Sequence, residues 1–148
     1  MAPLITLLVG TIAARCIGWL GVGYVNSWPA ALAVGLAAMF VLTGFAHFAL
    51  PLRRDLIAIV PPRLPAPGLL VTLTGLLELL GAVGLLVPAT RVAAAICLLL
   101  MMLAMFPANV YASRMPNPPK SMTTRLPLRT AIEVVFLAAA IAVAVGSG

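Results

Sequence analysis

The acidic residue Glu78 stands near the centre of an apolar stretch, residues 68–87, that contains no other charged residue. A charge at mid-membrane costs about 2.5–3.5 kcal/mol on insertion scales, so ionisable groups within such stretches are treated as functional candidates. A carboxyl at that depth is expected to be protonated or paired with a cation. Two roles carry equal weight for Glu78: a structural pair or hydrogen bond that fixes helix register, and a proton-handling or ligand-binding group.

Two arginines are candidate partners for acidic residues of this kind. Arg15 lies near the centre of the first apolar stretch, and its similar depth predicts a pair with Glu78. Glu133, in the last apolar stretch, follows Arg129 by four residues, a spacing that permits a local ion pair on a helix. Glu133 is therefore more easily explained structurally than Glu78.

His47 is the only histidine and lies at the end of the second apolar stretch, four residues before Pro51. A hydrogen bond to backbone freed before Pro51 is one role for it, and a hydrogen bond donated to a quinone carbonyl is the alternative. One histidine cannot supply two haem ligands, and no His/Cys/carboxylate cluster has the spacing of a catalytic metal site. Asn109 is expected to satisfy backbone groups at a break made by Pro107.

Motifs of the common catalytic chemistries are absent from the sequence. There is no G-x-S-x-G, Walker, G-x-G-x-x-G or H-E-x-x-H pattern, which argues against a self-contained hydrolase, kinase or nucleotide-driven pump. No catalytic residue is assigned, and the chain supplies no cofactor constellation of its own. Cys16 and Cys97 lie in separate apolar stretches without C-x-x-C spacing, which favours small core residues over a redox pair.

The composition indicates which elements must position these residues. Hydrophobic residues make up 64% of the 148 residues, charged residues 8%, and the mean hydropathy is +1.20. A soluble domain has roughly 45–50% apolar and about 25% charged residues. So few charges cannot cover a water-facing surface. The chain is therefore expected to be one integral membrane domain, residues 1–148, solvated by lipid.

Five apolar stretches of about 20 residues, the length that spans a bilayer as a helix, define the expected fold. They cover residues 4–25, 30–50, 68–87, 92–112 and 126–146. Lipid leaves unpaired backbone unsatisfied, and the polar alternation of barrel strands is missing, so a transmembrane helix bundle of the all-α class is predicted. A cleaved signal peptide is the weaker alternative for the first stretch, because it lacks a basic n-region.

The basic residues predict the orientation in the membrane. Seven of the nine gather in or next to two loops: Arg53, Arg54, Arg63, Arg114, Lys120, Arg125 and Arg129. With five spans both loops fall on one side, and the positive-inside rule puts that side and the N-terminus in the cytoplasm and the C-terminus outside. Basic loops beside apolar spans explain the net charge of +6 without nucleic-acid binding.

The loops themselves carry two further expectations. The apolar run of residues 56–60, stopped by two prolines, predicts a short interfacial helix, with the neighbouring arginines reaching lipid head groups. The second basic loop, through Pro116, Pro118 and Pro119, is expected to be extended and exposed.

Five short motifs follow one another along the chain: TGFAHF at 43–48 with Pro51, VPPRLP at 60–65, TGLLE at 74–78, GAVGLL at 81–86 and FPAN at 106–109. In their order and spacing they resemble the DoxX-like family of small bacterial membrane proteins. The resemblance implies a four-helix transmembrane core in the bacterial plasma membrane, to which this chain adds an N-terminal helix. It also implies an association with quinone-linked oxidoreductase complexes and with sulfur or redox-stress metabolism.

Three functional hypotheses follow, and none makes the chain a self-contained enzyme. The first, favoured by the resemblance, is an accessory or membrane subunit of a quinone-linked oxidoreductase complex, with a membrane redox partner. The second is a module that binds an apolar small molecule, quinone or lipid between its helices, alone or as a homo-oligomer. The third is an assembly or structural protein whose polar residues only specify packing, in which Glu78→Gln would be tolerated.

Overall fold

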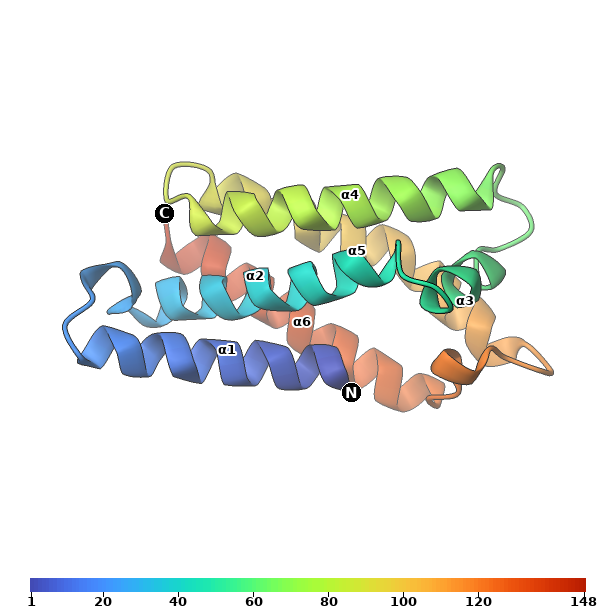
Figure 1. The fold of residues 1–148 in the computed structure, drawn as a ribbon, viewed down its shortest axis with the longest axis horizontal. Coiled ribbons are helices and arrows are strands. Elements are labelled where there is room, and N and C mark those ends of the chain that lie inside the picture. Colours follow the sequence, from blue (N-terminus) through green and yellow to red (C-terminus); the bar gives the residue numbers. More distant parts are fainter.

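Long apolar helices build the chain in the computed structural model, which describes residues 1–148 apart from the side chain of Met122. This described part contains five helices long and apolar enough to cross a membrane, and it contains no strand. These helices are α1 (Ala2–Trp19), α2 (Trp28–Ala46), α4 (Pro67–Leu86), α5 (Arg91–Arg114) and α6 (Leu126–Gly146), shown in Figure 1. The short elements between them are η1 (Gly23–Val25), α3 (Leu52–Ala58) and η2 (Lys120–Met122). The predicted all-α class is confirmed, with helices that fit a multi-pass membrane protein.

The first helix is shorter than the sequence predicts. A span over residues 4–25 was expected, whereas α1 ends at Trp19 and the chain turns through Gly21. Gly21 has a φ of +104°, a conformation that side chains with a Cβ rarely adopt. The segment η1 follows, and α2 begins after Ser27, whose Oγ accepts a hydrogen bond from the Ala30 amide at 3.3 Å. The glycine-rich end of the stretch therefore forms a connection and not a last helical turn.

The expected break at Pro107 is wrong. α5 runs without interruption from Arg91 to Arg114, with Pro107 inside it. Membrane helices tolerate proline because neighbouring helices and local adjustment satisfy the freed carbonyl. Asn109 is therefore not needed to repair a broken helix.

α2 is the central helix of the bundle. It contacts α1, α4 and α6, while α5 packs against α4 and α6 (Figure 1). The largest fully buried side chains come from three of these helices: Leu36, Met39, Leu85 and Val143. Glycines allow α1 and α2 to approach closely, since a Cβ on Gly10 would lie 3.1 Å from the Gly35 Cα. Large aliphatic side chains are exposed on the outer faces, as lipid solvation requires.

The two basic loops meet at one end of the bundle, as the sequence predicts. α3 contacts η2, and Asp55 of α3 accepts hydrogen bonds from the hydroxyl and the amide of Ser121. The short helix expected near residues 56–60 forms, but it begins earlier, at Leu52, and ends at Ala58. In the second loop Pro116 is exposed, whereas Pro118 and Pro119 are half-buried and not fully exposed as expected.

Candidate functional site

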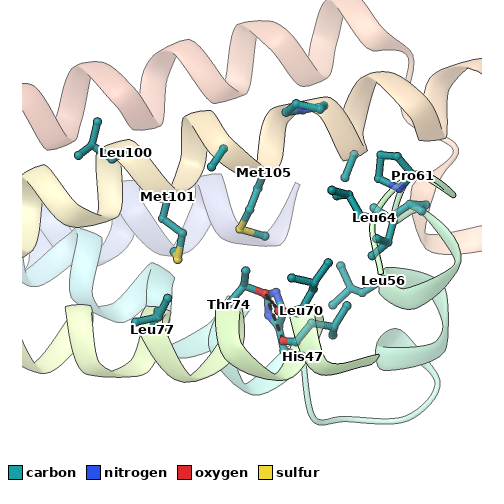
Figure 2. Close-up of a pocket in the computed structure, with 16 residues that line it drawn as sticks. His47, Leu56, Pro61, Leu64, Leu70, Thr74, Leu77, Leu100, Met101 and Met105 are labelled. Atoms are coloured by element: carbon teal, nitrogen blue, oxygen red, sulfur yellow. Dashed lines mark hydrogen bonds between the residues drawn. The ribbon is translucent and has the colours of Figure 1, made fainter. Parts of the chain in front are cut away.

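A cavity of about 500 Å³ lies between α4 and α5 and is closed at one end by α3 and the turn after it (Figure 2). Its sixteen lining residues are His47, Leu56, Ile59, Val60, Pro61, Leu64, Leu70, Val71, Thr74, Leu77, Leu100, Met101, Ala104, Met105, Pro107 and Ala108. Only His47 and Thr74 among these described residues carry polar side chains. The cavity is therefore an apolar chamber with two polar groups on one wall.

The cavity also opens sideways onto the outer surface of the bundle. Leu77 of α4 and Leu100 of α5 both line it, yet their exposed fractions are 52% and 58%. Such outward-facing leucines contact acyl chains when the helices cross a bilayer. The cavity is therefore open to the outer surface of the bundle between α4 and α5.

His47 presents one ring nitrogen for a ligand. The residue is 4% exposed, and its Nδ1 lies 2.8 Å from the Thr43 carbonyl oxygen one turn earlier. A carbonyl can only accept, so Nδ1 carries the proton and donates it to Thr43. Among the described residues no hydrogen bond reaches Nε2. His47 does bond to backbone, but to the Thr43 carbonyl, whereas the carbonyl that Pro51 leaves without an amide is that of His47 itself and accepts from Arg53. The bond to Thr43 leaves Nε2 of the neutral ring as an acceptor.

The hydroxyl of Thr74, the other polar group, donates its proton to carbonyls of its own helix. Its hydroxyl lies 2.9 Å from the Leu70 carbonyl and 3.2 Å from that of Val71, and it has one proton to donate to them. Its oxygen can still accept a hydrogen bond. The cavity wall thus offers two acceptors, His47 Nε2 and Thr74 Oγ1, to a ligand that donates.

Glu78 lies behind His47 and does not line the cavity. It is 5% exposed, and its Oε2 accepts a hydrogen bond from the Thr43 hydroxyl at 2.5 Å. The same oxygen lies 3.9 Å from His47 Nδ1. Thr43 therefore bonds to both groups, because its carbonyl accepts from the imidazole and its hydroxyl donates to the carboxyl.

The predicted pair of Arg15 and Glu78 is wrong. Arg15 donates a hydrogen bond to Asn26 Oδ1 at 3.0 Å, and its guanidinium lies 5.0 and 5.4 Å from the ring centres of Trp19 and Trp28. Because α1 ends at Trp19, Arg15 lies about one turn before the end of its helix and not near its middle. Cation–π contacts and the Asn26 carbonyl replace the expected carboxylate.

The predicted local pair of Arg129 and Glu133 is also wrong. Arg129 donates from Nε to the Thr124 carbonyl at 3.0 Å and from Nη1 to Asn109 Oδ1 at 3.1 Å. Asn109 thus accepts from α6 instead of repairing backbone beside Pro107. Glu133 is half-buried, and no hydrogen bond or ion pair of its carboxyl is found in the described part of the chain.

A close helix contact at Gly75 sets the position of His47. A Cβ on Gly75 would lie 2.5 Å from His47 Cβ and 3.0 Å from Phe48 Cε2, so only glycine fits there without displacement. Gly75 lies one turn before Glu78 on α4. The contact therefore brings the imidazole, the Thr43 side chain and the carboxyl together.

Arg53 organises the end of α2 and departs from the expectation that it reaches lipid head groups. Its Nη1 donates to the His47 carbonyl at 2.9 Å, and its Nη2 lies 3.2 Å from the Gly68 carbonyl and 3.0 Å from Thr72 Oγ1. The guanidinium thus ties the residue after α2 to the first turns of α4. Its position in a basic loop gave no signal of this role.

A second arginine that the sequence did not single out as a site residue is buried at the opposite end. Arg91 is 8% exposed, its Nε donates to the Leu85 carbonyl at 2.9 Å, and its Nη2 donates to the Tyr24 hydroxyl at 3.1 Å. Tyr24 in turn donates to the Leu86 carbonyl. Arg91 therefore satisfies the end of α4 and joins it to the α1–α2 connection.

The thiols and carboxylates offer no metal centre within the described residues. No group of three or more His, Cys, Asp or Glu residues there is arranged to hold a metal ion. Cys16 and Cys97 are exposed on the outer faces of α1 and α5, so their expected place in the core is wrong.

One family model matches most of the chain. It is described as a domain of unknown function, DUF8561, and it covers residues 36–144. This match includes His47, Glu78 and every residue that lines the cavity. No curated protein and no solved structure matches the chain.

Proposed function

The chain belongs to the DUF8561 family, and we propose that it binds a quinol-class ligand, an apolar ring bearing hydroxyl groups, between α4 and α5. The observation that carries this proposal is an apolar cavity whose wall presents the acceptor nitrogen of His47. Small-molecule pockets commonly measure about 300–1,000 Å³ and combine apolar walls with a few polar groups that fix orientation. The cavity of about 500 Å³ fits that description.

The hydrogen bond between His47 and Thr43 favours the reduced form of such a ligand. With the Nδ1 proton donated to Thr43, the neutral ring accepts at Nε2. A quinol hydroxyl donates such a bond, whereas a quinone carbonyl requires a donor. The sequence suggested that His47 donates to a quinone carbonyl, and the observed hydrogen bond supports the opposite polarity.

Glu78 acts on this site through His47. Oxidation of a quinol releases two electrons and two protons, and in this proposal a partner protein with a redox centre takes the electrons. His47 Nε2 accepts one proton from the ligand, and water at the membrane surface accepts the second. The carboxylate of Glu78, 3.9 Å from Nδ1, then stabilises the imidazolium. Glu78 is a positioning and charge-balancing residue, since it does not line the cavity.

The resemblance to DoxX-like proteins supports the wider part of the proposal, an accessory or membrane subunit of a quinone-linked oxidoreductase complex. The family match begins at residue 36, inside α2, which supports a core of α2, α4, α5 and α6 to which α1 is added. The basic loops at one end support an orientation with that end and the N-terminus in the cytoplasm of a bacterial cell.

Ligand binding is tested with the purified protein in lipid nanodiscs and a short-tailed quinol and quinone pair. The quinol is expected to bind more tightly than the quinone. His47→Leu should weaken quinol binding about fivefold, because one hydrogen bond contributes about 1 kcal/mol. Ala104→Phe, which fills the cavity from α5, should abolish binding, whereas Ala142→Phe on the outer face of α6 should not.

The outcomes separate the remaining functional hypotheses. Quinol binding that survives Ala104→Phe would place the ligand elsewhere and refute the proposal. Native mass spectrometry of protein gently extracted from its own membrane tests the partner. A stoichiometric protein with flavin, haem or iron–sulfur would support the subunit hypothesis, whereas a homo-oligomer that retains one small molecule would favour a self-sufficient binding module.

A further inference from the structure

A second pocket, with a volume of about 250 Å³, lies at the basic end of the bundle. It is formed by residues from the start of α1, from α5, from η2 and the loop after it, and from the first turns of α6. Its walls combine apolar side chains with a guanidinium, a carboxyl, the carboxamide of Asn109 and two hydroxyl groups, and Met1 with its terminal amine also lines it. None of its residues lines the cavity between α4 and α5, so the two sites are separate.

The two charged residues of this pocket, Arg129 and Glu133, do not neutralise each other. Arg129 donates from Nε to the Thr124 carbonyl and from Nη1 to Asn109 Oδ1. The two protons of Nη2 have no hydrogen-bond partner among the described residues. Within the same residues, neither Arg129 nor the Met1 ammonium lies at ion-pair distance from the Glu133 carboxyl. A half-buried carboxylate and a guanidinium with spare donors thus share one pocket.

The spacing of these charges defines the chemistry that they can bind. Residues four apart on a helix have Cβ atoms about 5–6 Å from each other on the same face. A ligand that carries a cation and an anion joined by a short spacer can therefore satisfy both charges at once. A purely anionic ligand would approach the Glu133 carboxylate, and a purely cationic one would approach Arg129.

We propose that this pocket binds the head group of an ethanolamine phospholipid, with its ammonium on Glu133 and its phosphate on Arg129. The ammonium has three protons to donate, and the hydroxyl groups of Ser121 and Thr124 lie in the same pocket. Phosphate accepts well from a guanidinium. A choline head group carries the same net charge but has no N–H, so it cannot donate to Glu133.

The remaining walls favour a lipid over a free phosphoethanolamine. Leu4 of α1, with Ile132 and Phe136 of α6, gives the pocket an apolar side that continues along two membrane-spanning helices. The first carbons of acyl chains can lie against these side chains. Arg129 lies in the first turn of α6 and Glu133 one turn further along, beside the basic loops.

The test compares ethanolamine, choline and glycerol phospholipids with identical acyl chains, added to delipidated protein and counted by native mass spectrometry. One ethanolamine lipid is expected to be retained at least about tenfold more tightly than the choline lipid, because hydrogen bonds to charged groups are the stronger kind. Glu133→Gln should reduce that preference to below about threefold. Arg114→Gln, which removes an exposed charge at the same end but outside the pocket, should leave it unchanged.

Several results would overturn the proposal. They are equal retention of ethanolamine and choline lipids, preference for the glycerol lipid, or a preference that persists in Glu133→Gln. Free phosphoethanolamine that binds as tightly as the lipid would overturn the assignment to a membrane lipid. The comparison of lipids on the unaltered protein decides the matter even if a variant fails to fold. The lipid preference does not depend on what the cavity between α4 and α5 binds, which the quinol assay measures separately.

Discussion

Replacing Gly75 by alanine is expected to force α4 away from the end of α2 and to deform the cavity. The new Cβ would lie 2.5 Å from His47 Cβ and 2.9 Å from its Cγ. Carbon atoms in favourable contact are about 3.5–4.0 Å apart. Relief of the overlap therefore requires a displacement of roughly 1 Å at the point where α4 contacts His47.

The expected cost follows from two opposing effects. Overpacking of a well-packed interior costs about 1–3 kcal/mol. Alanine gains roughly 0.5–1 kcal/mol over glycine within a helix. The free energy of unfolding should thus fall by roughly 0–2.5 kcal/mol in Gly75→Ala, with the middle of the two ranges giving about 1 kcal/mol. Quinol binding should weaken about fivefold as well, since the moved imidazole loses its hydrogen bond to the ligand.

Gly68→Ala is the matched control on the same helix. Its Cβ would meet only the Ile57 Cδ1, at 3.9 Å, which is an ordinary contact. This variant should be as stable as the unaltered protein or slightly more so. Reversible unfolding by dodecyl sulfate in mixed micelles, followed by tryptophan fluorescence, gives both free energies. Equal values for the two variants would refute the close-contact reasoning.

Three further predictions concern the hydrogen bonds of the bundle. Thr43→Val should lower the free energy of unfolding by about 1–3 kcal/mol, because the buried carboxyl of Glu78 loses its hydrogen-bond donor. Glu78→Gln keeps an acceptor oxygen for Thr43 and should therefore cost less in the same unfolding assay. Arg91→Leu should cost about 1–3 kcal/mol, since it leaves a buried carbonyl of α4 without its donor, and thermal unfolding in nanodiscs measures the loss. Asp55→Ala should change stability by no more than about 0.5 kcal/mol. It removes the acceptor of the Ser121 hydroxyl, so limited trypsin digestion should cleave the loop between α5 and α6 faster.

The five long apolar helices could be predicted from the sequence because lipid leaves the polar backbone of an apolar segment few alternatives. Each stretch of about 20 apolar residues must satisfy its own hydrogen bonds, and only a helix does so within one segment. The common side of the two basic loops followed from counting the spans. The early end of α1 was not predicted, since Gly21 and the η1 turn lie inside the same apolar stretch and hydropathy does not register backbone geometry.

Partners across helices could not be predicted in the same way. The pairing of Arg15 with Glu78 rested on depth, but contact also depends on helix rotation and on where each helix ends. Thr43 was recognisable in part, because it precedes His47 by one helical turn and shares its face. Its contact with Glu78 required the packing of α2 on α4. The cavity itself arises from the separation of α4 and α5 and from the turn after α3, which no single segment encodes.

The sideways opening between Leu77 and Leu100 affects how affinity should be expressed. A ligand that enters from the bilayer is governed by its mole fraction in the lipid, not by its concentration in water. Each methylene of an isoprenoid tail favours partition out of water by about 0.8 kcal/mol, yet in the bilayer it exchanges one apolar contact for another. Aqueous dissociation constants would therefore rank ligands by tail length, whereas constants on the mole-fraction scale would rank them by the ring that meets His47.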